Sequence, residues 1–525
     1  MPAPASKLSS SSLAQANQAE VFSFLGDSKT FGVAEPVQRI DTHGAAVFLA
    51  GGEVYKVKRA VRFPFMDFST LEKRRAACEA EIAINKPNAP DIYLGAIPIA
   101  RTPNGLALGG AGDIVEWAVH MRRFDENATL DRLAERAALS PDILAKLALA
   151  ILQSHERAPR RDGEAATQAL ERYLDQNEQA FAANPDLFEA EQVGRLAADA
   201  RAALAATREL LTARGAAGYV RRCHGDLHLR NIALIDGEPV LFDAVEFDDS
   251  IATGDVLYDL AFLLMDLEER GLRRAGNLIF NRFLQQSDEA QLAGLAALPI
   301  FLSIRSAIRA KVLAANLESL HAEARDRAAA DARRYFWCAE DFLKPAPTRL
   351  LAIGGLSGTG KSVMAAELAP LLGRAPGAVL LRSDIERKKL FHVAETEKLP
   401  VSAYAAAASE RVYEAVLRKA TSALQAGQSV VVDAVHATSE ERERVERAAR
   451  DVNVEFIGLW LEAPLFIRLR RVEQRTGDAS DADAAVVRTQ TAPVSLSPIW
   501  RRLDASSDPA TTFANARALV NLATR

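Results

Sequence analysis

The eight-residue stretch "GLSGTGKS" at 355–362 constrains the fold of this chain more than any other feature. Its glycines, lysine and serine match the pattern G-x-x-x-x-G-K-[ST], known as Walker A, at every fixed position. The apolar run "RLLAIG" precedes it and the helical pattern "SVMAAELAPLL" follows it, which is the context that the pattern requires. The sequence therefore predicts a strand, a phosphate-binding loop and a helix, in that order.

The pattern of the chain changes at the Pro-rich stretch "KPAPT" (344–348), which is the expected linker between two domains. After it, the apolar runs "GAVLLRSD", "QSVVVDAV" and "VEFIGLWLEA" alternate with amphipathic helical segments. Such alternation indicates a parallel sheet with helices on both faces. We therefore expect an α/β P-loop domain over 349–525.

Within the loop, glycine backbones can curl around phosphate oxygens and donate N–H groups to them. Lys361 is expected to reach the β- and γ-phosphates of ATP, and the Ser362 hydroxyl is expected to bind Mg²⁺. The alternative is a glycine-rich turn without a ligand. The residues expected to bind the nucleotide are Gly355, Ser357, Gly358, Thr359, Gly360, Lys361 and Ser362.

Phosphoryl transfer also needs an acceptor site, an acid near the metal and positive charge over the transferred group. Asp384, at the end of "GAVLLRSD", is the candidate base, and Arg387 is the candidate contact for an anionic acceptor. Asp433, which ends "SVVVD", is the candidate acid near Mg²⁺. Arg471 and Arg475 are four residues apart and share one helix face, so they could close over the phosphates as a lid. A solvated arginine face is the alternative for this pair.

This second domain resembles the small P-loop kinases of the gluconate kinase, polynucleotide 5′-kinase and zeta-toxin type. The resemblance rests on "GLSGTGKS", "SDIER", "VVVDA" and "RRVEQRTGDASDAD". It implies phosphorylation of a hydroxyl with ATP and Mg²⁺. It also implies that Asp384 is the substrate-binding or base aspartate and that Arg471 and Arg475 are lid arginines.

A second polar cluster, "HGDLHLRN" at 224–231, lies in the first half of the chain. Zinc is disfavoured there because zinc sites need three or four ligands, and no other Cys/His pair has a suitable spacing. Asp226 can instead accept the proton of an acceptor hydroxyl, while Asn231 and Asp243 hold Mg²⁺ against ATP. The pattern favours a catalytic loop.

This division of labour requires a lysine on an upstream strand and a glutamate on the helix that follows. Lys56 in "EVYKVKR" and Glu81 in "RRAACEAEIAIN" satisfy the requirement. Lys58 is a rival for the lysine because it has the same strand alternation, and Glu79 is a rival for the glutamate.

"HGDLHLRN", "LFDAVEF" and "GDVLYDLAFLL" together resemble the aminoglycoside phosphotransferase and choline kinase-like family. The resemblance implies an α+β, two-lobed protein-kinase-like fold, expected over 21–343, with a hinge at 115–124. It implies that Asp226 is the catalytic base, that Asn231 and Asp243 are metal ligands, and that Asp259 braces the catalytic loop. Two departures leave the substrate open: "DTHGAAVF" replaces a Gly-rich loop, and Arg230 stands where relatives often have a small residue.

The remaining composition limits location and partners. The net charge of −5 disfavours bulk binding of nucleic acid, although a local groove at "RKK" (387–389) leaves it open for the second domain. No apolar run approaches the length of a membrane span, and residues 1–20 lack the apolar core of a signal peptide. We therefore expect a disordered lead-in over 1–20 and a cytoplasmic protein without a membrane partner.

These observations predict a bifunctional, ATP- and Mg²⁺-dependent phosphotransferase that acts on hydroxyls of small molecules. Arg305 and Arg309 share one face of a predicted helix, which favours an anionic or sugar-like acceptor over a cationic aminoglycoside. A solvated basic face is the alternative. Two other hypotheses stay open: a regulatory protein that senses ATP without transfer, and a polynucleotide 5′-kinase in the second domain. The oligomeric state is open.

Overall fold

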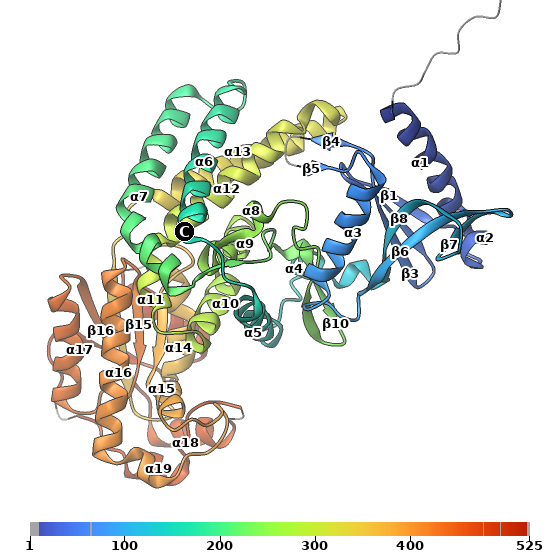
Figure 1. Ribbon diagram of the computed structural model, residues 1–525. Helices are drawn as coiled ribbons and strands as arrows, with labels where there is room; N and C mark the ends of the chain where they lie inside the picture. Colours follow the sequence, from blue (N-terminus) through green and yellow to red (C-terminus); the bar gives the residue numbers. More distant parts are fainter. Residues whose placement is uncertain (1–9, 64–65, 476, 494, 522–525) are drawn as a thin grey trace, which may run out of the picture. The chain divides into compact units, whose positions relative to one another are not determined.

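The chain divides into two compact units, each built from two stretches of sequence. The first unit is Met1–Ala169 with Gly215–Leu263, and the second is Leu170–Arg214 with Leu264–Arg525. The computed structural model describes residues 10–63, 66–475, 477–493 and 495–521 (Figure 1). Each unit contains one of the two predicted functional regions.

The first unit contains a six-stranded antiparallel sheet with the strand order β1-β2-β3-β8-β6-β7. The β2–β3 hairpin turns at Gly51–Gly52, and Gly51 has a φ of +57°, which glycine adopts readily. Helix α3 (Leu71–Asn85) starts at the Thr70 cap and packs against β6 and β8. The strands are β1 (Gln38–Asp41), β2 (Ala45–Ala50), β3 (Glu53–Lys58), β6 (Tyr93–Thr102), β7 (Gly105–Leu108) and β8 (Asp113–Arg122); β4 (Arg62–Phe63) and β5 (Met66–Asp67) form a separate hairpin.

Helix α1 (Ser10–Gly26) corrects the expectation of a disordered lead-in. Residues 1–9 lie outside the described residues, but from Ser10 the chain is helical. The buried Gln18 donates to the Lys58 carbonyl at 2.8 Å and to Glu116 Oε2 at 2.8 Å. Val21 and Leu25 of the same helix are buried in a cluster with Phe48 and Tyr55, so apolar packing on the sheet as well as these hydrogen bonds holds the helix in place.

A second hairpin in the first unit determines where the predicted metal ligands lie. β10 (Ile232–Ile235) and β11 (Glu238–Leu241) pair antiparallel around a tight turn. Because the chain folds back, the Phe242 N–H donates to the Asn231 carbonyl at 3.0 Å. Asn231 and Asp243 therefore lie at the same end of the hairpin although twelve positions separate them in the sequence.

The first unit also contains further helices and short strands. They are α2 (Ser28–Phe31), α4 (Leu130–Glu135), α5 (Pro141–Arg157), β9 (Val220–Arg222), α8 (Asp249–Ala252) and β12 (Thr253–Asp255), with the 3-10 helices η1 (Glu126–Ala128) and η2 (Leu229–Asn231). The division between the units falls within α6 (Gly163–Ala182), α7 (Ala190–Ala217) and α9 (Val256–Glu269).

Part of the core of the second unit is formed by a group of long helices. Phe336 packs at 5.1 Å, ring centre to ring centre, against both Phe181 and Phe188. Ser303 and Ser306 on α12 donate their hydroxyls to carbonyls of α13, which holds these helices close together. The helices are α10 (Arg273–Gln286), α11 (Gln291–Gly294), α12 (Leu298–Ala315) and α13 (Ala322–Leu343), with η3 (Leu295–Ala297) and η4 (Leu317–Ser319).

One stretch of these helices, Gln291–Ala315, is long and apolar enough to cross a membrane by composition, with a mean hydropathy of 1.5. The expectation that no apolar run approaches this length is therefore wrong. However, 78% of its most apolar window is buried within the protein, and Arg305 on it is only 5% exposed. Such burial is typical of a core helix.

The rest of the second unit is a parallel five-stranded sheet in the order β14-β15-β13-β16-β17. Four strands are those that the sequence predicts, whereas β17, which contains two arginines, was not expected. The strands are β13 (Arg349–Gly355), β14 (Val379–Arg382), β15 (Val430–Asp433), β16 (Glu455–Glu462) and β17 (Trp500–Asp504). The sheet confirms the predicted α/β class of this domain. The expected linker, 344–348, has neither helix nor strand, and its role as a domain boundary stays a prediction.

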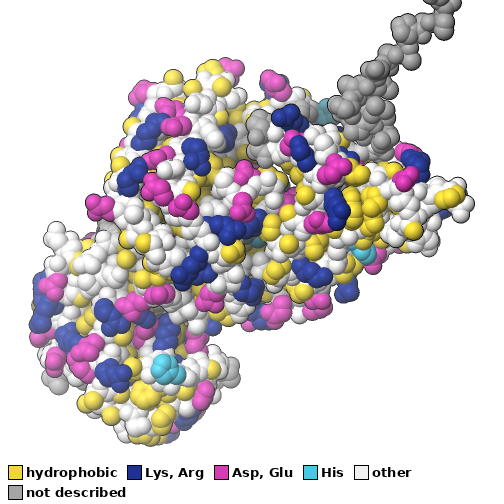
Figure 2. All heavy atoms as spheres, viewed as in Figure 1, with side chains coloured by type: hydrophobic (Ala, Val, Ile, Leu, Met, Phe, Trp, Pro, Cys, Tyr) yellow, Lys and Arg dark blue, Asp and Glu magenta, His cyan; other side chains and the backbone are white. Residues whose placement is uncertain are grey.

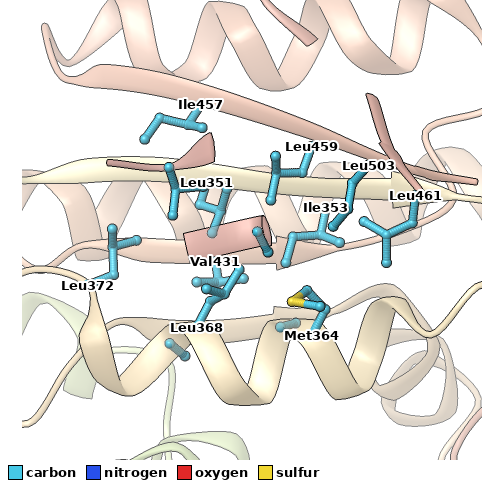
Figure 3. Close-up of a cluster of buried hydrophobic side chains, with 14 of the residues drawn as sticks. Leu351, Ile353, Met364, Leu368, Leu372, Val431, Ile457, Leu459, Leu461 and Leu503 are labelled. Atoms are coloured by element: carbon cyan, nitrogen blue, oxygen red, sulfur yellow. The ribbon is translucent and has the colours of Figure 1, made fainter. Parts of the chain in front are cut away.

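Helices cover both faces of this sheet. Figure 3 shows the core on the side of α14, where Met364 and Leu368 pack against Leu351, Ile353 and Val431. Helix α20 completes this side, while α16 and α17 pack against the strands elsewhere. The helices are α14 (Lys361–Leu368), α15 (Ser383–Leu390), α16 (Ala406–Gln425), α17 (Ser439–Asp451), α18 (Leu465–Glu473), α19 (Ala484–Thr489) and α20 (Pro509–Leu519), with η5 (Ala369–Leu371) and η6 (Val401–Tyr404). On the face drawn in Figure 2, basic and acidic side chains are interspersed.

Candidate active sites

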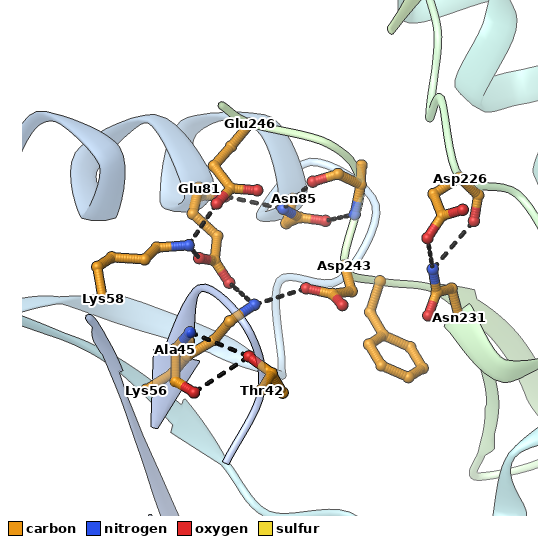
Figure 4. Close-up of polar contacts among 12 residues, drawn as sticks. Thr42, Ala45, Lys56, Lys58, Glu81, Asn85, Asp226, Asn231, Asp243 and Glu246 are labelled. Carbon is orange, nitrogen blue, oxygen red and sulfur yellow. Dashed lines mark hydrogen bonds and ion pairs between the residues drawn. The ribbon is translucent and has the colours of Figure 1, made fainter. Parts of the chain in front are cut away.

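Lys56 on β3 lies between two carboxylates (Figure 4). Its Nζ donates to Glu81 Oε1 at 2.9 Å and to Asp243 Oδ1 at 2.7 Å. Burial opposes the charge of this amine, but Asp243 and Glu81 outweigh burial and raise the pKa of Lys56 well above its ordinary value. The rival Glu79 is exposed and pairs with Arg75 at 2.9 Å. Lys56 therefore joins the sheet, helix α3 and the loop after β11.

Glu81 is shared by two lysines, and their surroundings distinguish them. Lys58 Nζ donates to Glu81 Oε2 at 2.5 Å and also to Glu246. Lys58 is enclosed, at 2% exposure, whereas the Lys56 side chain is 17% exposed and reaches a predicted metal ligand. The two lysines lower the pKa of Glu81 to about 2 against the effect of its burial. The structure thus favours Lys56 as the nucleotide-facing lysine, and this role stays a prediction.

Asp226 and Asn231 face each other within the predicted catalytic loop. Asn231 Nδ2 donates to Asp226 Oδ2 at 3.0 Å and to the Asp226 carbonyl at 3.0 Å. The Asp226 side chain is 40% exposed, so an acceptor hydroxyl can reach it from solvent. Asn231 is buried and fixes the direction of the carboxylate.

The Asp243 backbone is strained, with a φ of +58°, and neighbouring side chains hold it in place. The Asp243 N–H donates to Tyr93 Oη at 3.1 Å. The next N–H, that of Ala244, donates to Asn85 Oδ1 at 2.7 Å. The Asp243 side chain remains 44% exposed. Helix α3 and strand β6 therefore aim this carboxylate toward the side of the site where Lys56 lies.

The first histidine of "HGDLHLRN", His224, is part of the scaffold. His224 Nε2 bonds the Phe242 carbonyl at 2.9 Å, and burial lowers the pKa of His224, which keeps it neutral. Asp259 accepts the Gly225 N–H at 2.8 Å and bonds His155 Nε2 at 3.0 Å. Asp259 thus braces the loop, as the sequence predicts.

The region before Lys56 has a short turn in place of a Gly-rich loop. Between β1 and β2, Thr42 Oγ1 accepts the Ala45 N–H at 3.0 Å, which closes the turn. Most of the expected hinge, 115–124, lies within β8, and the chain leaves the strand only after Arg122. Beyond it, Phe124 packs edge-on against Phe242 with ring centres 5.1 Å apart.

The second site is built around the predicted phosphate-binding loop. Gly358 and Gly360 have φ values of +82° and +96°, which L side chains rarely adopt. A Cβ at Gly358 would approach the Arg468 carbonyl oxygen to 2.6 Å, so helix α18 packs directly on the loop. Lys361 Nζ donates to the Leu356 carbonyl at 3.2 Å. Burial lowers the pKa of Lys361, and the nearby Asp433 and Asp384 offset this only in part.

Asp433 ends strand β15 and is almost completely buried. Its Oδ2 accepts from Arg382 Nε at 3.2 Å. The same guanidinium donates to Asp478 Oδ1 at 2.7 Å. Arg382, which sequence reasoning missed, therefore links the predicted metal acid to the segment 478–490, which begins at Asp478 and ends at Gln490.

Asp384 lies in the first turn of helix α15 rather than at the end of the strand, because β14 stops at Arg382. Burial, and then the negative charge of Asp433, raise the pKa of Asp384. A carboxylate with a raised pKa is a better proton acceptor than an ordinary aspartate. The position therefore suits the role of base that the sequence predicts.

Arg387 is buried on the same helix, and its guanidinium stacks over the Tyr404 ring at 4.8 Å. It donates to the Ala403 carbonyl at 2.6 Å, while its Nε has no hydrogen-bond partner within the described part of the chain. The next residue, Lys388, is 1% exposed and bound to Asp481 at 2.6 Å. Two of the three basic residues of "RKK" are therefore buried and engaged within the protein, and polynucleotide binding at this stretch is untested.

Arg471 and Arg475 lie on or just after α18 but bind different partners. Arg471 donates to the Thr359 carbonyl at 3.3 Å and so touches the phosphate-binding loop. Arg475 donates to the carbonyls of Ser480 at 2.9 Å and Ala482 at 2.7 Å, within the 478–490 segment. Their joint closure over the phosphates stays a prediction.

One cavity of about 1110 Å³ joins these groups. Residues 357–362 of the loop line it together with Asp384, Arg387 and Asp433, and Arg471 and Arg475 line it as well. All the residues predicted for the second site except Gly355 therefore face a common space.

Sequence reasoning missed several residues of both sites. Glu246 and Asn85 in the first site, and Arg382, Asp481 and Gln490 in the second, form contacts over long sequence separations. No local pattern marks Glu246, Asn85, Arg382 or Gln490. The acidic run "GDASDAD" was a signal, because its aspartates include the anchors Asp478 and Asp481.

Comparison with family models finds two matches. A model described as a phosphotransferase enzyme family matches residues 93–295. A model described as an AAA domain matches residues 350–496. The first region contains the catalytic loop and the second contains the phosphate-binding loop.

Curated relatives extend over both regions. Uncharacterized proteins of Mycobacterium tuberculosis and Mycobacterium bovis are 30% identical to this chain over 454 residues. The alignment covers 85% of this chain and 88% of each relative.

Solved structures are similar to the two regions separately. A choline/ethanolamine kinase family protein from Mesorhizobium loti is 14% identical, covers 62% of this chain and 99% of its own, and has a TM-score of 0.35. A gluconokinase from Sinorhizobium meliloti is 18% identical, covers 34% of this chain and 95% of its own, and has a TM-score of 0.25.

Proposed function

Since this chain belongs to the same family as the uncharacterized mycobacterial proteins, with a phosphotransferase-type domain before a P-loop kinase domain, we propose that it is a bifunctional kinase. Each domain would transfer the γ-phosphate of ATP to a hydroxyl of a small molecule. The observation that carries the proposal is the position of Lys56 Nζ, 2.9 Å from Glu81 and 2.7 Å from Asp243.

In the first site, Asp226 accepts the proton of the acceptor hydroxyl, and Lys56 binds the phosphates of ATP. Asn231 and Asp243 supply an amide and a carboxylate oxygen. These are the donors that Mg²⁺ prefers, so the residues fit this ion. Bound Mg²⁺ would neutralise charge on the phosphates. The contacts of Asp243 with Tyr93, and of Ala244 with Asn85, keep this ligand in position before the nucleotide arrives.

In the second site, the loop 357–362 and Lys361 bind the phosphates, and Ser362 and Asp433 provide oxygen ligands for Mg²⁺. Asp384 accepts the acceptor proton. The buried Arg387, whose Nε lacks a partner among the described residues, supports an acceptor that carries an anionic group.

A transfer assay with γ-labelled ATP tests the proposal. The wild type, Asp226→Asn and Lys361→Ala would each be incubated with fractionated metabolites and Mg²⁺. We expect some labelled products to be lost only in Asp226→Asn and others only in Lys361→Ala. Asp236→Asn, in the turn of the β10–β11 hairpin, is the matched control and should retain all products. Retained ATP binding without any labelled product would contradict transfer and favour an ATP sensor.

The acceptor of the first domain is proposed to be anionic or sugar-like rather than an aminoglycoside. Arg305, on which this expectation partly rests, is buried, and it belongs to the second compact unit rather than to the unit that contains Asp226. Efficient ATP-dependent phosphorylation of kanamycin-type compounds, abolished by Asp226→Asn, would refute the proposal. The proposal also includes a cytoplasmic location without a membrane partner. The burial of the apolar stretch Gln291–Ala315 supports this part of the proposal.

A further inference from the structure

Gln490, the residue after helix α19, makes a two-point contact with the phosphate-binding loop. Its Oε1 accepts the Ser357 backbone N–H at 2.8 Å. Its Nε2 donates to Ser357 Oγ at 3.0 Å. Both residues line the cavity of the second site. The side-chain amide of Gln490 therefore occupies a backbone donor of a loop whose N–H groups bind phosphate.

The side-chain amine of Lys361, the lysine of the loop, also has a hydrogen-bond acceptor within the protein. Lys361 Nζ donates to the Leu356 carbonyl at 3.2 Å, although a nucleotide would draw this ammonium to its phosphates. The Thr359 hydroxyl donates to the same carbonyl at 2.8 Å. Two donors of the loop, the Lys361 amine and the Thr359 hydroxyl, thus bind a carbonyl of the loop itself, whereas Gln490 supplies an acceptor for the Ser357 N–H from outside the loop.

Among the contacts of the described residues that hold the 478–490 segment, that of Gln490 joins neutral groups. Asp478 binds the Arg382 guanidinium at 2.7 Å, and Asp481 binds Lys388 Nζ at 2.6 Å. Charge-assisted bonds of this kind are roughly twice as strong as bonds between neutral groups. An incoming phosphate, which is an anion, makes a stronger bond to the Ser357 N–H than the Gln490 amide does. The hydrogen bonds between Gln490 and Ser357 are therefore the ones that we expect the phosphate to replace.

We propose that Gln490 is a positioning residue that competes with the phosphates of the nucleotide for Ser357. Nucleotide binding then frees the C-terminal end of α19 from the loop, while Asp478 and Asp481 keep the start of the segment attached. The inference rests on the proposed nucleotide binding at the second site. It adds that this site has a built-in competitor which lowers its affinity.

Nucleotide affinity in the full chain tests the competition. A Lys56→Met/Asp243→Asn background removes the first site, and calorimetry then measures binding of ATP, ADP and pyrophosphate with Mg²⁺. Gln490→Ala removes the competitor, so we expect roughly three- to tenfold tighter binding, the value of one or two hydrogen bonds. Gln490→Glu places a carboxylate against the loop and should weaken binding. Unchanged or weaker binding in Gln490→Ala would overturn the proposal.

Thr489→Ala is the matched control. The Thr489 hydroxyl bonds only to the Ala485 and Val486 carbonyls of its own helix among the contacts of the described residues. Its removal should leave nucleotide affinity within twofold of the background. A tightening equal to that of Gln490→Ala would show that loosening α19, rather than freeing Ser357, changes the affinity, and would also overturn the proposal.

Hydrogen exchange gives a readout that does not depend on catalysis. If Gln490 leaves the loop, saturating nucleotide should speed exchange of the amides at 484–489, and it should have no such effect in Gln490→Ala. Slower exchange with nucleotide would mean that α19 closes more tightly, which contradicts the proposal.

The failure of this inference can be distinguished from the failure of the proposed function. Lys361→Ala should abolish nucleotide binding in the same background. If it does, while Gln490→Ala fails to tighten binding, only the competition is wrong. If the background protein binds no nucleotide at all, both the second active site and its competitor are refuted.

Discussion

At the scale of single residues, buried charges hold the first site together. Glu81 uses both carboxylate oxygens, one for Lys56 and one for Lys58, and Lys58 continues to Glu246. The charges of these four residues compensate one another only while all of them are present. Removal of one partner leaves another charge buried without compensation. The pairing therefore makes helix α3 part of the site rather than a support at its edge.

Replacement of Glu81 by Gln should destabilise the protein by about 3 kcal/mol, because the enclosed Lys58 ammonium and the largely buried Lys56 ammonium would lose their shared carboxylate. The same change at the exposed Glu79 should alter stability by less than about 0.5 kcal/mol. Chemical denaturation of both variants measures the difference. Equal effects would show that the burial of Glu81 does not matter to folding.

His436 provides a second prediction at this scale, from its charge state. It is 1% exposed, and burial, assisted by Lys361 and Arg442, lowers the pKa of His436 to about 3. The folded pKa is thus below the unfolded value of about 6.5. Between these values only the unfolded chain binds the proton, so the stability contribution is complete above pH 6.5 and is lost as the pH falls toward 3.

The free energy of unfolding should fall by about 1.4 kcal/mol per pH unit, or by about 2 kcal/mol between pH 6.5 and pH 5. His436→Phe removes the titration and keeps a ring beside Trp500, which lies 5.4 Å away. Thermal unfolding of the wild type and this variant at several pH values gives the difference. A difference that does not change between pH 7 and pH 5 would contradict the buried, neutral imidazole.

At the scale of elements, helix α10 covers the edge of the parallel sheet. Asn277 and Asn281, one turn apart and both buried, donate to the Ala378 carbonyl at 3.0 and 3.1 Å. Asn281 Oδ1 also accepts the Leu380 N–H at 2.6 Å. These amides replace the partner that an edge strand lacks. They also hold β14, which leads directly into the helix that carries Asp384.

Asn281→Ala should therefore destabilise the edge of the sheet by about 1–3 kcal/mol, because the Leu380 N–H and the Ala378 carbonyl lose partners. Hydrogen exchange of the full chain should show faster exchange at 379–382. Gln286→Ala, at the exposed end of the same helix, should leave this exchange unchanged. Equal protection of β14 in both variants would mean that the asparagines contribute nothing to the edge.

At the scale of the whole molecule, the helices before the expected linker belong to the same compact unit as the P-loop kinase sheet. The unit includes Leu264–Arg525. Its internal contacts include Arg273 with the Pro370 carbonyl at 2.6 Å and Arg374 with the Leu295 carbonyl at 2.9 Å. Residues 344–348 thus connect the helices before them to the P-loop kinase sheet after them, and side-chain hydrogen bonds join these two parts as well.

Cleavage within 344–348 should consequently leave the protein in one piece under native conditions. A protease site placed in this stretch would allow the folded chain to be cut, and size-exclusion chromatography would show whether both fragments elute together. Denaturant should separate them, which is the control for complete cleavage. Separation in buffer alone would show that the contacts of α10 with β14 do not hold the unit together.

Local patterns in the sequence account for those parts of the protein that depend on neighbours along the chain. The phosphate-binding loop follows from a strand, glycines with positive φ and a helix start within a few residues. Asn231 and Asp243 were also predictable, because a short hairpin brings them to one end. Four strands of the parallel sheet were evident from continuous apolar runs, whereas the fifth, with two arginines, was not.

The residues that hold these groups in place are identified only by contacts between distant parts of the folded chain. The choice between Lys56 and Lys58 depends on burial and on Glu246, which lies 188 positions from Lys58. Gln490 reaches Ser357 across 133 positions. The helix at residues 10–26 lies beside the sheet because Gln18 finds partners there and because Val21 and Leu25 are buried there. A hydrogen bond or an ion pair depends on distance in space, and the pattern of a sequence carries no record of which distant side chains folding will bring within 3 Å.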